Sequence, residues 1–249
     1  MSRLWLIVPA AGQGRRMGAE CPKQYLDIAG RPVLAHTLAR LHEAFPEAAL
    51  RLCLDPDDTR FSPEWVPFAD WQRVAGGRER VDSVENALAS LADVAADDDL
   101  VLVHDVARPC VAVEDLRRLR EALTTSPEGG LLAAPVADTM KRADARGHVV
   151  HTVSREGLWH AMTPQGAPYR VLCRAFAHAR GAGVVLTDEA SALEAWGLAP
   201  RLVPGRRDNL KITHPEDLAL ATRLLAGDPA SRRATGALSD DSLADEARS

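Results

Sequence analysis

The stretch 9-PAAGQGRRMGAECPKQY-25 follows the short apolar run 4-LWLIV-8 near the start of the chain. It contains three glycines, two adjacent arginines and a lysine, and its first acidic residue is Glu20. A glycine-rich turn lets backbone N–H groups approach an anion closely, because no Cβ atom stands in the way. An apolar strand that leads into such a turn indicates an α/β protein with a phosphate-binding site after its first strand.

The glycine spacing fits neither of the two common phosphate-binding motifs. Gly12, Gly14 and Gly18 form G-x-G-x-x-x-G, whereas a dinucleotide-binding fold has G-x-G-x-x-G and an acidic residue about 20 positions later. Here the next strand ends at Asp55, 41 residues after Gly14. The P-loop pattern is absent as well. A strand-exit turn with ordinary surface charge remains an alternative for this segment taken alone.

The positive charge of the segment favours a triphosphate as the ligand. Arg15, Arg16 and Lys23 can add charge-assisted hydrogen bonds to the phosphate oxygens. Pro22 puts Lys23 just after a rigid turn, from which its side chain can fold back over the loop. A dinucleotide pyrophosphate, held largely by a helix N-terminus, does not need this density of cations.

Composition excludes several classes of protein. Hydrophobic residues make up 46% and charged residues 26% of the 249 positions, as in ordinary globular proteins. The net charge of −5 argues against bulk nucleic-acid binding, so any basic site must be local. No apolar run approaches the ~20 residues of a membrane span, and no signal-peptide pattern opens the sequence. We therefore expect a cytoplasmic protein.

Short apolar runs alternate with helical patterns along the first half of the chain. The runs that predict strands are 4–8, 49–54, 100–104 and 130–136, and the diglycine 76–77 closes a further strand. Apolar residues at helical spacing predict helices over 32–44, 83–94 and 113–123. Several strands are apolar on consecutive positions, as expected when helices cover both faces. The alternation predicts an α/β fold with a mostly parallel sheet.

The α/β rhythm breaks after Val136. The segment that follows is polar, and its alternating stretch 148-HVVHTVSR-155 predicts a small antiparallel excursion. The rhythm then resumes with helices predicted over 168–180, 187–197 and 215–227, and with strand-like runs at 201–205 and 210–213. We expect one domain over residues 1–226, with 136–159 inserted in it, and a disordered tail over 227–249.

Polar residues at the ends of other predicted elements point to the same site. Asp105 and Arg108 directly follow a strand, at the sheet edge where open α/β proteins bind their ligands. Arg80 and Ser83 stand at the start of a helix, where Ser83 could equally be a plain N-cap. Asp105 could likewise be a helix cap or a turn residue. Thr187 and Lys211 add polar groups late in the chain, and Lys211 taken alone could be a solvated surface residue.

Taken together, these segments resemble the 2-C-methyl-D-erythritol 4-phosphate cytidylyltransferase family. The similar stretches are, in the family's order, PAAGQGRRMGAECPKQY, GGRERVDSV, VHDVARPC, APVADTMKR, HTVSREGLWHAMTPQ, LTDEASALE and DNLKIT. They extend from about residue 4 to residue 222. The resemblance implies a Rossmann-like nucleotidyltransferase fold with a protruding β-arm, a Mg²⁺ cofactor held mainly by the CTP phosphates, and a homodimer.

The resemblance also implies a role for individual residues. Arg16 and Lys23 would stabilise the transition state at the α-phosphate of CTP, and Arg155 and Lys211 would position the methylerythritol phosphate. The residues implied to line the nucleotide are Ala10, Ala11, Gly12, Gly14, Gly77, Ser83 and Asp105. Those implied to hold the sugar phosphate are Asp105, Arg108, Thr139, Arg155, Thr163, Thr187 and Lys211. The segment 136–159 would hook over the partner subunit, so that Thr139, Arg155 and Thr163 serve the partner's site.

The expected reaction transfers CMP from CTP to 2-C-methyl-D-erythritol 4-phosphate and releases pyrophosphate. The nucleophile is the phosphate monoester of the substrate, whose second pKa is near ~6, so that no enzyme base is needed. Three rival functions are a cytidylyltransferase for another polyol phosphate, an NAD-dependent oxidoreductase and a non-catalytic nucleotide-binding module. The late third glycine and the paired arginines argue against the oxidoreductase.

Overall fold

The computed structural model describes residues 2–12 and 21–227 of the chain. Its centre is a seven-stranded sheet with the order β11-β7-β10-β6-β1-β4-β5. The strands of this sheet are β1 (Leu4–Pro9), β4 (Ala49–Leu54), β5 (Trp71–Ala75), β6 (Leu100–Val103), β7 (Gly130–Pro135), β10 (Trp159–Pro168) and β11 (Arg201–Pro204). All neighbouring pairs are parallel except those of β10, which runs antiparallel to β6 and β7. The mostly parallel sheet expected from the sequence is confirmed.

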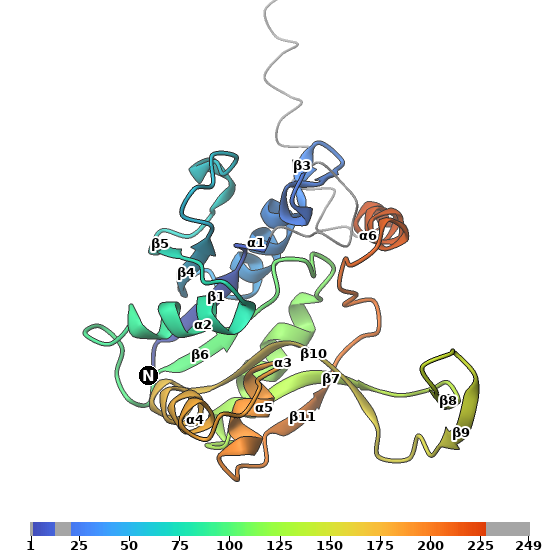
Figure 1. The fold of residues 1–249 in the computed structure, drawn as a ribbon. Coiled ribbons are helices and arrows are strands. Elements are labelled where there is room, and N and C mark those ends of the chain that lie inside the picture. Colours follow the sequence, from blue (N-terminus) through green and yellow to red (C-terminus); the bar gives the residue numbers. More distant parts are fainter. Residues whose placement is uncertain (1, 13–20, 228–249) are drawn as a thin grey trace, which may run out of the picture.

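Helices cover both faces of this sheet (Figure 1). The helices are α1 (Val33–Ala44), α2 (Arg80–Ala89), α3 (Val113–Thr124), α4 (Tyr169–Gly181), α5 (Glu189–Ala195) and α6 (Pro215–Gly227), with short 3-10 turns at Lys23–Tyr25 and Pro63–Trp65. Apolar side chains of α1 and α3 pack on one face of the sheet, and those of α2, α4 and α5 pack on the other. No helix among the described residues is long and apolar enough to cross a membrane.

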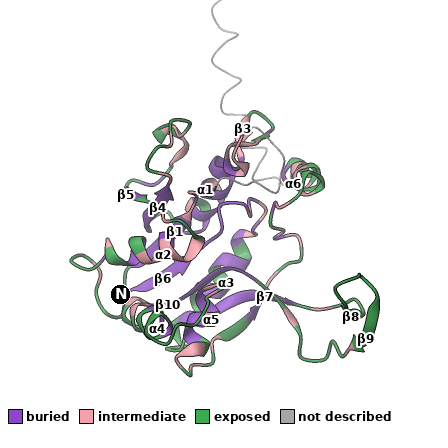
Figure 2. Cartoon of the chain, viewed as in Figure 1, coloured by how far each residue is buried: buried purple, intermediate pink, exposed green. Residues whose placement is uncertain are grey.

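The burial pattern explains why the strands read as continuous apolar runs. Every residue of β4 and β6 is buried, because helices cover both of their faces (Figure 2). The two small sheets differ. The pair β2 (Asp27–Ile28) and β3 (Arg31–Pro32) leads into α1, and the pair β8 (Met140–Ala143) and β9 (Val149–Val153) is almost wholly exposed.

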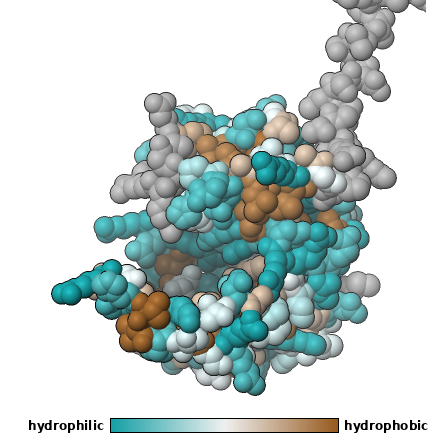
Figure 3. All heavy atoms as spheres, turned by 90° about the vertical axis from the view of Figure 1, so that its right-hand side faces the viewer, coloured by the Kyte–Doolittle hydropathy of each residue, from teal (hydrophilic) through white to brown (hydrophobic). Residues whose placement is uncertain are grey.

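The predicted antiparallel excursion after Val136 is confirmed. Strands β8 and β9 pair antiparallel in an arm, here defined as residues 136–159, which projects away from the main sheet (Figure 1). The backbone N–H of Val136 donates to the carbonyl oxygen of Leu158 at 3.0 Å, which closes the base of the arm. Val149 and Val150 are 62% and 61% exposed. Figure 3 shows the molecule from the arm's side, where hydrophobic residues form separate patches on a largely hydrophilic surface.

Three details of the sequence prediction need correction. The run 210–213 forms no strand, because its backbone leaves the sheet and donates from Ile212 N to the carbonyl of Ala107 at 2.8 Å. Helix α2 spans Arg80–Ala89 and not 83–94, because Glu79 and Asp82 form a capping box at its N-terminus and the chain goes into turns from Ser90 onward. Strand β10 belongs to the main sheet, which the sequence pattern does not predict. The predicted tail lies outside the described residues, apart from Gly227 at the end of α6.

Candidate active site

A basin of about 730 Å³ lies where four neighbouring parallel strands end. It is lined by the segments that follow β1, β4, β5 and β6, together with residues from two other turns. These lining residues are Pro9, Ala10, Ala11, Gly12, Lys23, Gln24, Asp55, Gly77, Arg78, Glu79, Arg80, Ser83, Asp105, Val106, Ala107 and Lys211. Strand β1 sits between β4 and β6, where the strand order reverses, and ligands of open α/β sheets bind at such a point.

Most of the residues predicted from the sequence meet in this basin. Ala10, Ala11, Gly12, Lys23, Gly77, Ser83, Asp105 and Lys211 all line it. Gly14 and Arg16 lie outside the described residues. Arg108 and Thr163 border the basin of their own chain through contacts with Asp105, so that Thr163 lies at its own basin and not, as expected, on the partner's side. Thr139 and Arg155 lie on the exposed arm, and Thr187 lies on the surface just before α5, so that none of these three lines the basin of its own chain.

Close packing explains two of the glycines at the basin wall. A Cβ atom on Gly76 would lie 2.1 Å from the Cβ atom of Ala11, so a side chain there would push the turn after β1 out of place. A Cβ atom on Gly77 would lie 2.2 Å from the Cβ atom of Asp82. The diglycine therefore lets the turn after β5 approach both the first turn and α2.

Ser83 is not the N-cap of α2. Glu79 has that position, and Ser83 is 2% exposed inside the first turn of the helix. The backbone N–H of Gly77 donates to Ser83 Oγ at 2.9 Å, and the hydroxyl donates to the carbonyl of Glu79 at 3.3 Å. Ser83 thereby holds the backbone of the turn that lines the basin.

Asp105 is the centre of a cluster of charges at the basin floor. Its Oδ1 accepts from Arg80 Nε at 2.8 Å, and its Oδ2 lies 2.9 Å from Lys211 Nζ and 3.5 Å from Arg108 Nε. Burial alone would raise the pKa of Asp105, but Arg80, Lys211 and Arg108 hold it well below its usual range. Asp105 is therefore ionised throughout the physiological range of pH.

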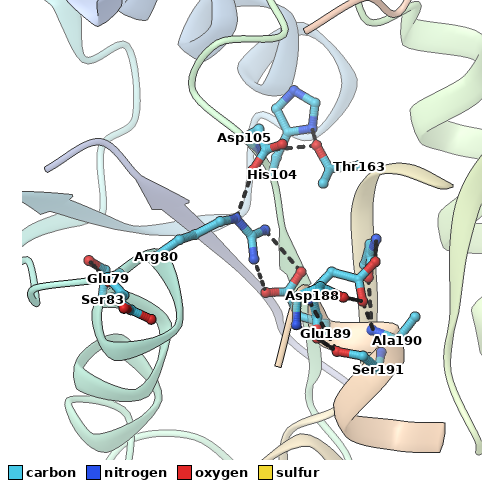
Figure 4. Close-up of polar contacts among 12 residues, drawn as sticks. Glu79, Arg80, Ser83, His104, Asp105, Thr163, Asp188, Glu189, Ala190 and Ser191 are labelled. Carbon is cyan, nitrogen blue, oxygen red and sulfur yellow. Dashed lines mark hydrogen bonds and ion pairs between the residues drawn. The ribbon is translucent and has the colours of Figure 1, made fainter. Parts of the chain in front are cut away.

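Sequence reasoning assigned no role to Arg80 and missed Glu189 altogether. Arg80 Nη1 and Nη2 donate to the two carboxylate oxygens of Glu189 at 2.7 and 3.0 Å (Figure 4). Glu189 is fully buried at the start of α5, and the two residues are 109 positions apart. In the sequence Glu189 looks like an ordinary acidic residue in the first turn of a helix, a position that such residues often occupy. Only its pairing with a distant arginine distinguishes it.

The loop that carries Lys211 is fastened beneath the basin. Asn209 Nδ2 donates to the carbonyl of Thr163 at 2.9 Å, and the carbonyl of Asn209 accepts from Arg108 Nη1 at 2.6 Å. Asn209 is 1% exposed. These bonds replace the strand expected at 210–213, and they place Lys211 beside Asp105.

The described part of the chain offers no preformed cluster of metal ligands. Residues 2–12 and 21–227 contain no group of three or more histidine, cysteine, aspartate or glutamate side chains placed to hold a metal ion. Asp105, at the basin floor, is already surrounded by three cations. A divalent ion in this basin would need most of its ligands from the oxygens of a bound phosphate compound and from water.

Comparison with known proteins identifies similar sequences over most of the chain. The family model described as 2-C-methyl-D-erythritol 4-phosphate cytidylyltransferase matches residues 4–226. A protein of that name from Dechloromonas aromatica is 49% identical over 233 residues, which cover 90% of this chain and 98% of the relative. One from Escherichia coli O1:K1 / APEC is 49% identical over 219 residues, covering 86% of this chain and 90% of the relative.

Solved structures agree with these relatives. The crystal structure of the Francisella tularensis 2-C-methyl-D-erythritol 4-phosphate cytidylyltransferase matches with a TM-score of 0.77 at 33% identity, over 90% of this chain and 100% of that chain. The Thermus thermophilus enzyme of the same name matches with a TM-score of 0.74 at 35% identity, over 90% of this chain and 98% of that chain.

Proposed function

Since this chain belongs to the 2-C-methyl-D-erythritol 4-phosphate cytidylyltransferase family, we propose that its basin binds CTP and 2-C-methyl-D-erythritol 4-phosphate and joins them. The chain is a nucleotidyltransferase. It transfers CMP to the polyol phosphate, giving 4-diphosphocytidyl-2-C-methyl-D-erythritol and pyrophosphate, a step of non-mevalonate isoprenoid precursor synthesis. The observation that carries the assignment of the site is the meeting of Gly12, Lys23, Asp105 and Lys211 in one basin at the strand-order reversal.

The nucleotide lies, in this proposal, between the first turn and the start of α2. The N–H of Ala10 bonds to the carbonyl of Cys53 at 2.8 Å, so the backbone N–H groups that face the triphosphate in this proposal are those of Ala11 and Gly12. Gly14 and Arg16 keep the roles that the resemblance implies. Gly77 and Ser83 border the cytosine. Support comes from the close packing of the Gly76–Gly77 turn on Ala11, which brings the two walls together. Lys23 lines the same basin as Gly12 and adds a positive charge near the α-phosphate.

The polyol phosphate lies, in this proposal, against the turn after β6. Arg108 and Lys211 flank Asp105 there and can contact the hydroxyl and phosphate oxygens of the substrate. Thr163 and Thr187 complete this side of the site. The side chain of Lys211 is partly exposed beside Asp105, so its ammonium group can also reach a phosphate.

The reaction requires positioning and charge neutralisation. An oxygen of the substrate's 4-phosphate attacks the α-phosphorus of CTP, a new P–O bond forms, and the bond to the β-phosphate breaks with release of pyrophosphate. The attacking phosphate is largely dianionic at neutral pH, so no proton has to be removed. Lys23 and Arg16 stabilise charge on the α-phosphate, while Lys211 orients the attacking group.

We propose Mg²⁺ as the cofactor, held mainly by the CTP phosphates. The chemistry of the basin fits such an ion, because its walls offer cations and backbone amides for phosphate oxygens, and the described residues offer no cluster of carboxylates. When bound, the ion neutralises part of the triphosphate charge and orients its oxygens. Within the chain, Lys23 and the first turn would hold the phosphates that carry it.

Thr139 and Arg155 lie on the exposed arm, away from the basin of their own chain. An isolated two-stranded hairpin is marginally stable in water, and β8–β9 projects from the rest of its own chain. We propose that the arm packs on a second subunit of a homodimer, where Thr139 and Arg155 complete the partner's site. The exposed Val149 and Val150 provide apolar surface for that contact.

The proposed function is tested by incubation with CTP, Mg²⁺ and a panel of polyol phosphates, with pyrophosphate release as the readout. We expect release only with 2-C-methyl-D-erythritol 4-phosphate, and none without the divalent ion. Faster release with another polyol phosphate would reassign the substrate. No release with any acceptor, together with a fluorescence change on NADH titration, would favour the oxidoreductase. CTP binding without turnover would indicate a binding module.

A further inference from the structure

A fully buried carboxylate lies behind the basin and is not among its lining residues. Glu189 is 0% exposed, and both of its carboxylate oxygens accept hydrogen bonds from the guanidinium of Arg80. Removing an ionised side chain this completely from water costs several kcal/mol, which the attraction to its partner only partly offsets. The pair therefore adds little to the free energy of folding, and its geometry indicates another role.

The backbone around Glu189 is held rigidly. Asp188 caps α5 by accepting from the backbone N–H of Ser191 at 2.9 Å (Figure 4). Gln165 of β10 accepts from the backbone N–H of Ala190 at 2.8 Å and donates to Asp188 Oδ2 at 2.9 Å. The start of α5, which carries Glu189, is thus hydrogen-bonded to strand β10 of the main sheet, and this fixes the position of the carboxylate.

The guanidinium of Arg80 divides its donors between two carboxylates. Each of its terminal nitrogens donates to one oxygen of Glu189, and in this orientation Nε is the nitrogen that donates to Asp105 Oδ1, at 2.8 Å. The other oxygen of Asp105 therefore remains available to Lys211 at 2.9 Å. An arginine free of Glu189 would present its whole planar fork, which matches both oxygens of one carboxylate and competes with lysine for them.

We propose that Glu189 is a positioning residue of the transferase site. It clamps Arg80 so that this arginine holds one oxygen of Asp105 and leaves the other to Lys211. Glu189 also offsets one of the three cations around Asp105, so that the excess positive charge of the cluster is smaller with Glu189 than without it. This inference rests on the proposed function, because it assigns the clamp to the side of the basin that takes the polyol phosphate.

The first part of the test is kinetic. Glu189→Gln keeps the shape of the side chain and removes its charge. We expect it to lower kcat/KM for 2-C-methyl-D-erythritol 4-phosphate on the order of 10- to 100-fold, as misplacement of a positioning group does, and to change KM for CTP by less than about twofold. Glu85→Gln is the matched control. Glu85 lies on α2 and forms a glutamate–arginine pair with Arg180, but this pair is on the surface. The activity of the Glu85→Gln variant should be unchanged.

A double-substitution cycle separates positioning from a merely structural role. If Glu189 acts through Asp105, the double variant Glu189→Gln/Asp105→Asn should be no slower than Asp105→Asn alone. Two independent losses that multiply would overturn the inference. If Glu189→Gln does not fold, Glu189→Asp carries the same cycle, since it keeps the buried charge but withdraws the carboxylate by one methylene group.

The second part of the test does not need turnover. The Nε–H resonance of Arg80, assigned by its loss in Arg80→Lys, should exchange with water at least about tenfold faster in the Glu189 variants than in the unaltered protein and in Glu85→Gln. An unaltered protein without transferase activity would refute the proposed function, while this exchange rate would still decide the inference. Equal exchange rates of the Arg80 Nε–H in the unaltered protein, in Glu85→Gln and in both Glu189 variants would overturn the inference.

Discussion

The Thr163 hydroxyl lies 3.0 Å from Nδ1 of His104, and together the two side chains support the backbone of the basin floor. Nε2 of His104 lies 3.3 Å from the carbonyl oxygen of Arg108, which can only accept, so the ring proton resides on Nε2. Nδ1 then accepts from the hydroxyl of Thr163, whose oxygen accepts in turn from the backbone N–H of Asp105 at 3.0 Å. The neutral ring with its proton on Nε2 makes all three bonds in this way.

The stability of the protein should therefore depend on the protonation of His104. Burial lowers the pKa of His104 from 6.5 to about 4. As pH falls, His104 takes up a proton in the unfolded chain before it does so in the folded protein. The stability gained from a neutral, buried His104 is therefore fully present above pH 6.5 and is lost as pH falls toward 4. The loss amounts to about 3 kcal/mol at most.

Urea unfolding of the unaltered protein and of His104→Asn between about pH 7.5 and 4 should show that the difference between their free energies of unfolding shrinks as pH falls. Parallel curves would contradict the prediction, and the similarly lowered pKa of His36 cancels in the comparison.

The hydroxyl of Thr163 should be needed for the fold of the basin floor. Thr163→Val leaves Nδ1 of His104 and the N–H of Asp105 without a partner, and we expect a loss of about 2 kcal/mol in the free energy of unfolding. Thr163→Ser keeps the hydroxyl and should lose less than half as much. The alternative is that the hydroxyl mainly binds substrate, as the family resemblance implies. In that case Thr163→Val would raise KM for the polyol phosphate with unfolding unchanged.

Replacement of Lys23 should remove a charge from the transition state. We expect Lys23→Ala to lower kcat by roughly 10²-fold or more, as the loss of one strong contact to a developing anion does. Steady-state pyrophosphate release measures this. Arg170→Ala is the control, because Arg170 is an exposed cation that pairs with Asp97 outside the basin. Near-normal turnover in Lys23→Ala would exclude the proposed role.

The acid limb of the pH–rate profile should follow the substrate and not the protein. The nucleophile is the phosphate dianion, so the rate should fall below the second pKa of that phosphate, near ~6. An isosteric substrate with a lower second pKa should shift the limb downward by the same interval. A limb that stays at one pH with both substrates would indicate a titrating protein group.

Arg155 should act in the site of the partner subunit. Arg155→Ala and Lys23→Ala subunits should each be inactive alone. After mixing in equal amounts and exchange, half of the dimers are mixed, and each has one intact site, so about a quarter of full activity should return. Mass spectrometry of labelled subunits proves the exchange. Activity that stays at the level of the parents would show that the arm does not act in trans.

The sequence alone determined the features that depend on neighbours along the chain. Consecutive apolar residues identified β1, β4, β6 and β7, because strands covered on both faces rarely carry polar side chains. Helical periodicity located α3 and α6 to within a residue. Glycine and charge in the first turn indicated a phosphate site, since both properties follow from residue chemistry and need no tertiary contact.

Only the tertiary structure decided which distant groups meet. Strand β10 enters antiparallel between β6 and β7, an order that no local pattern specifies, because strand pairing is set by packing over the whole sheet. The run 210–213 has the apolar character of a strand, yet its hydrogen bonds go to the turn after β6. In the sequence, Arg80 stands at the entry to a predicted helix near the expected site, and Glu189 reads as an ordinary first-turn residue of another helix. Their meeting behind the basin turns them into a pair, because a buried charge is stable only where the fold supplies its partner.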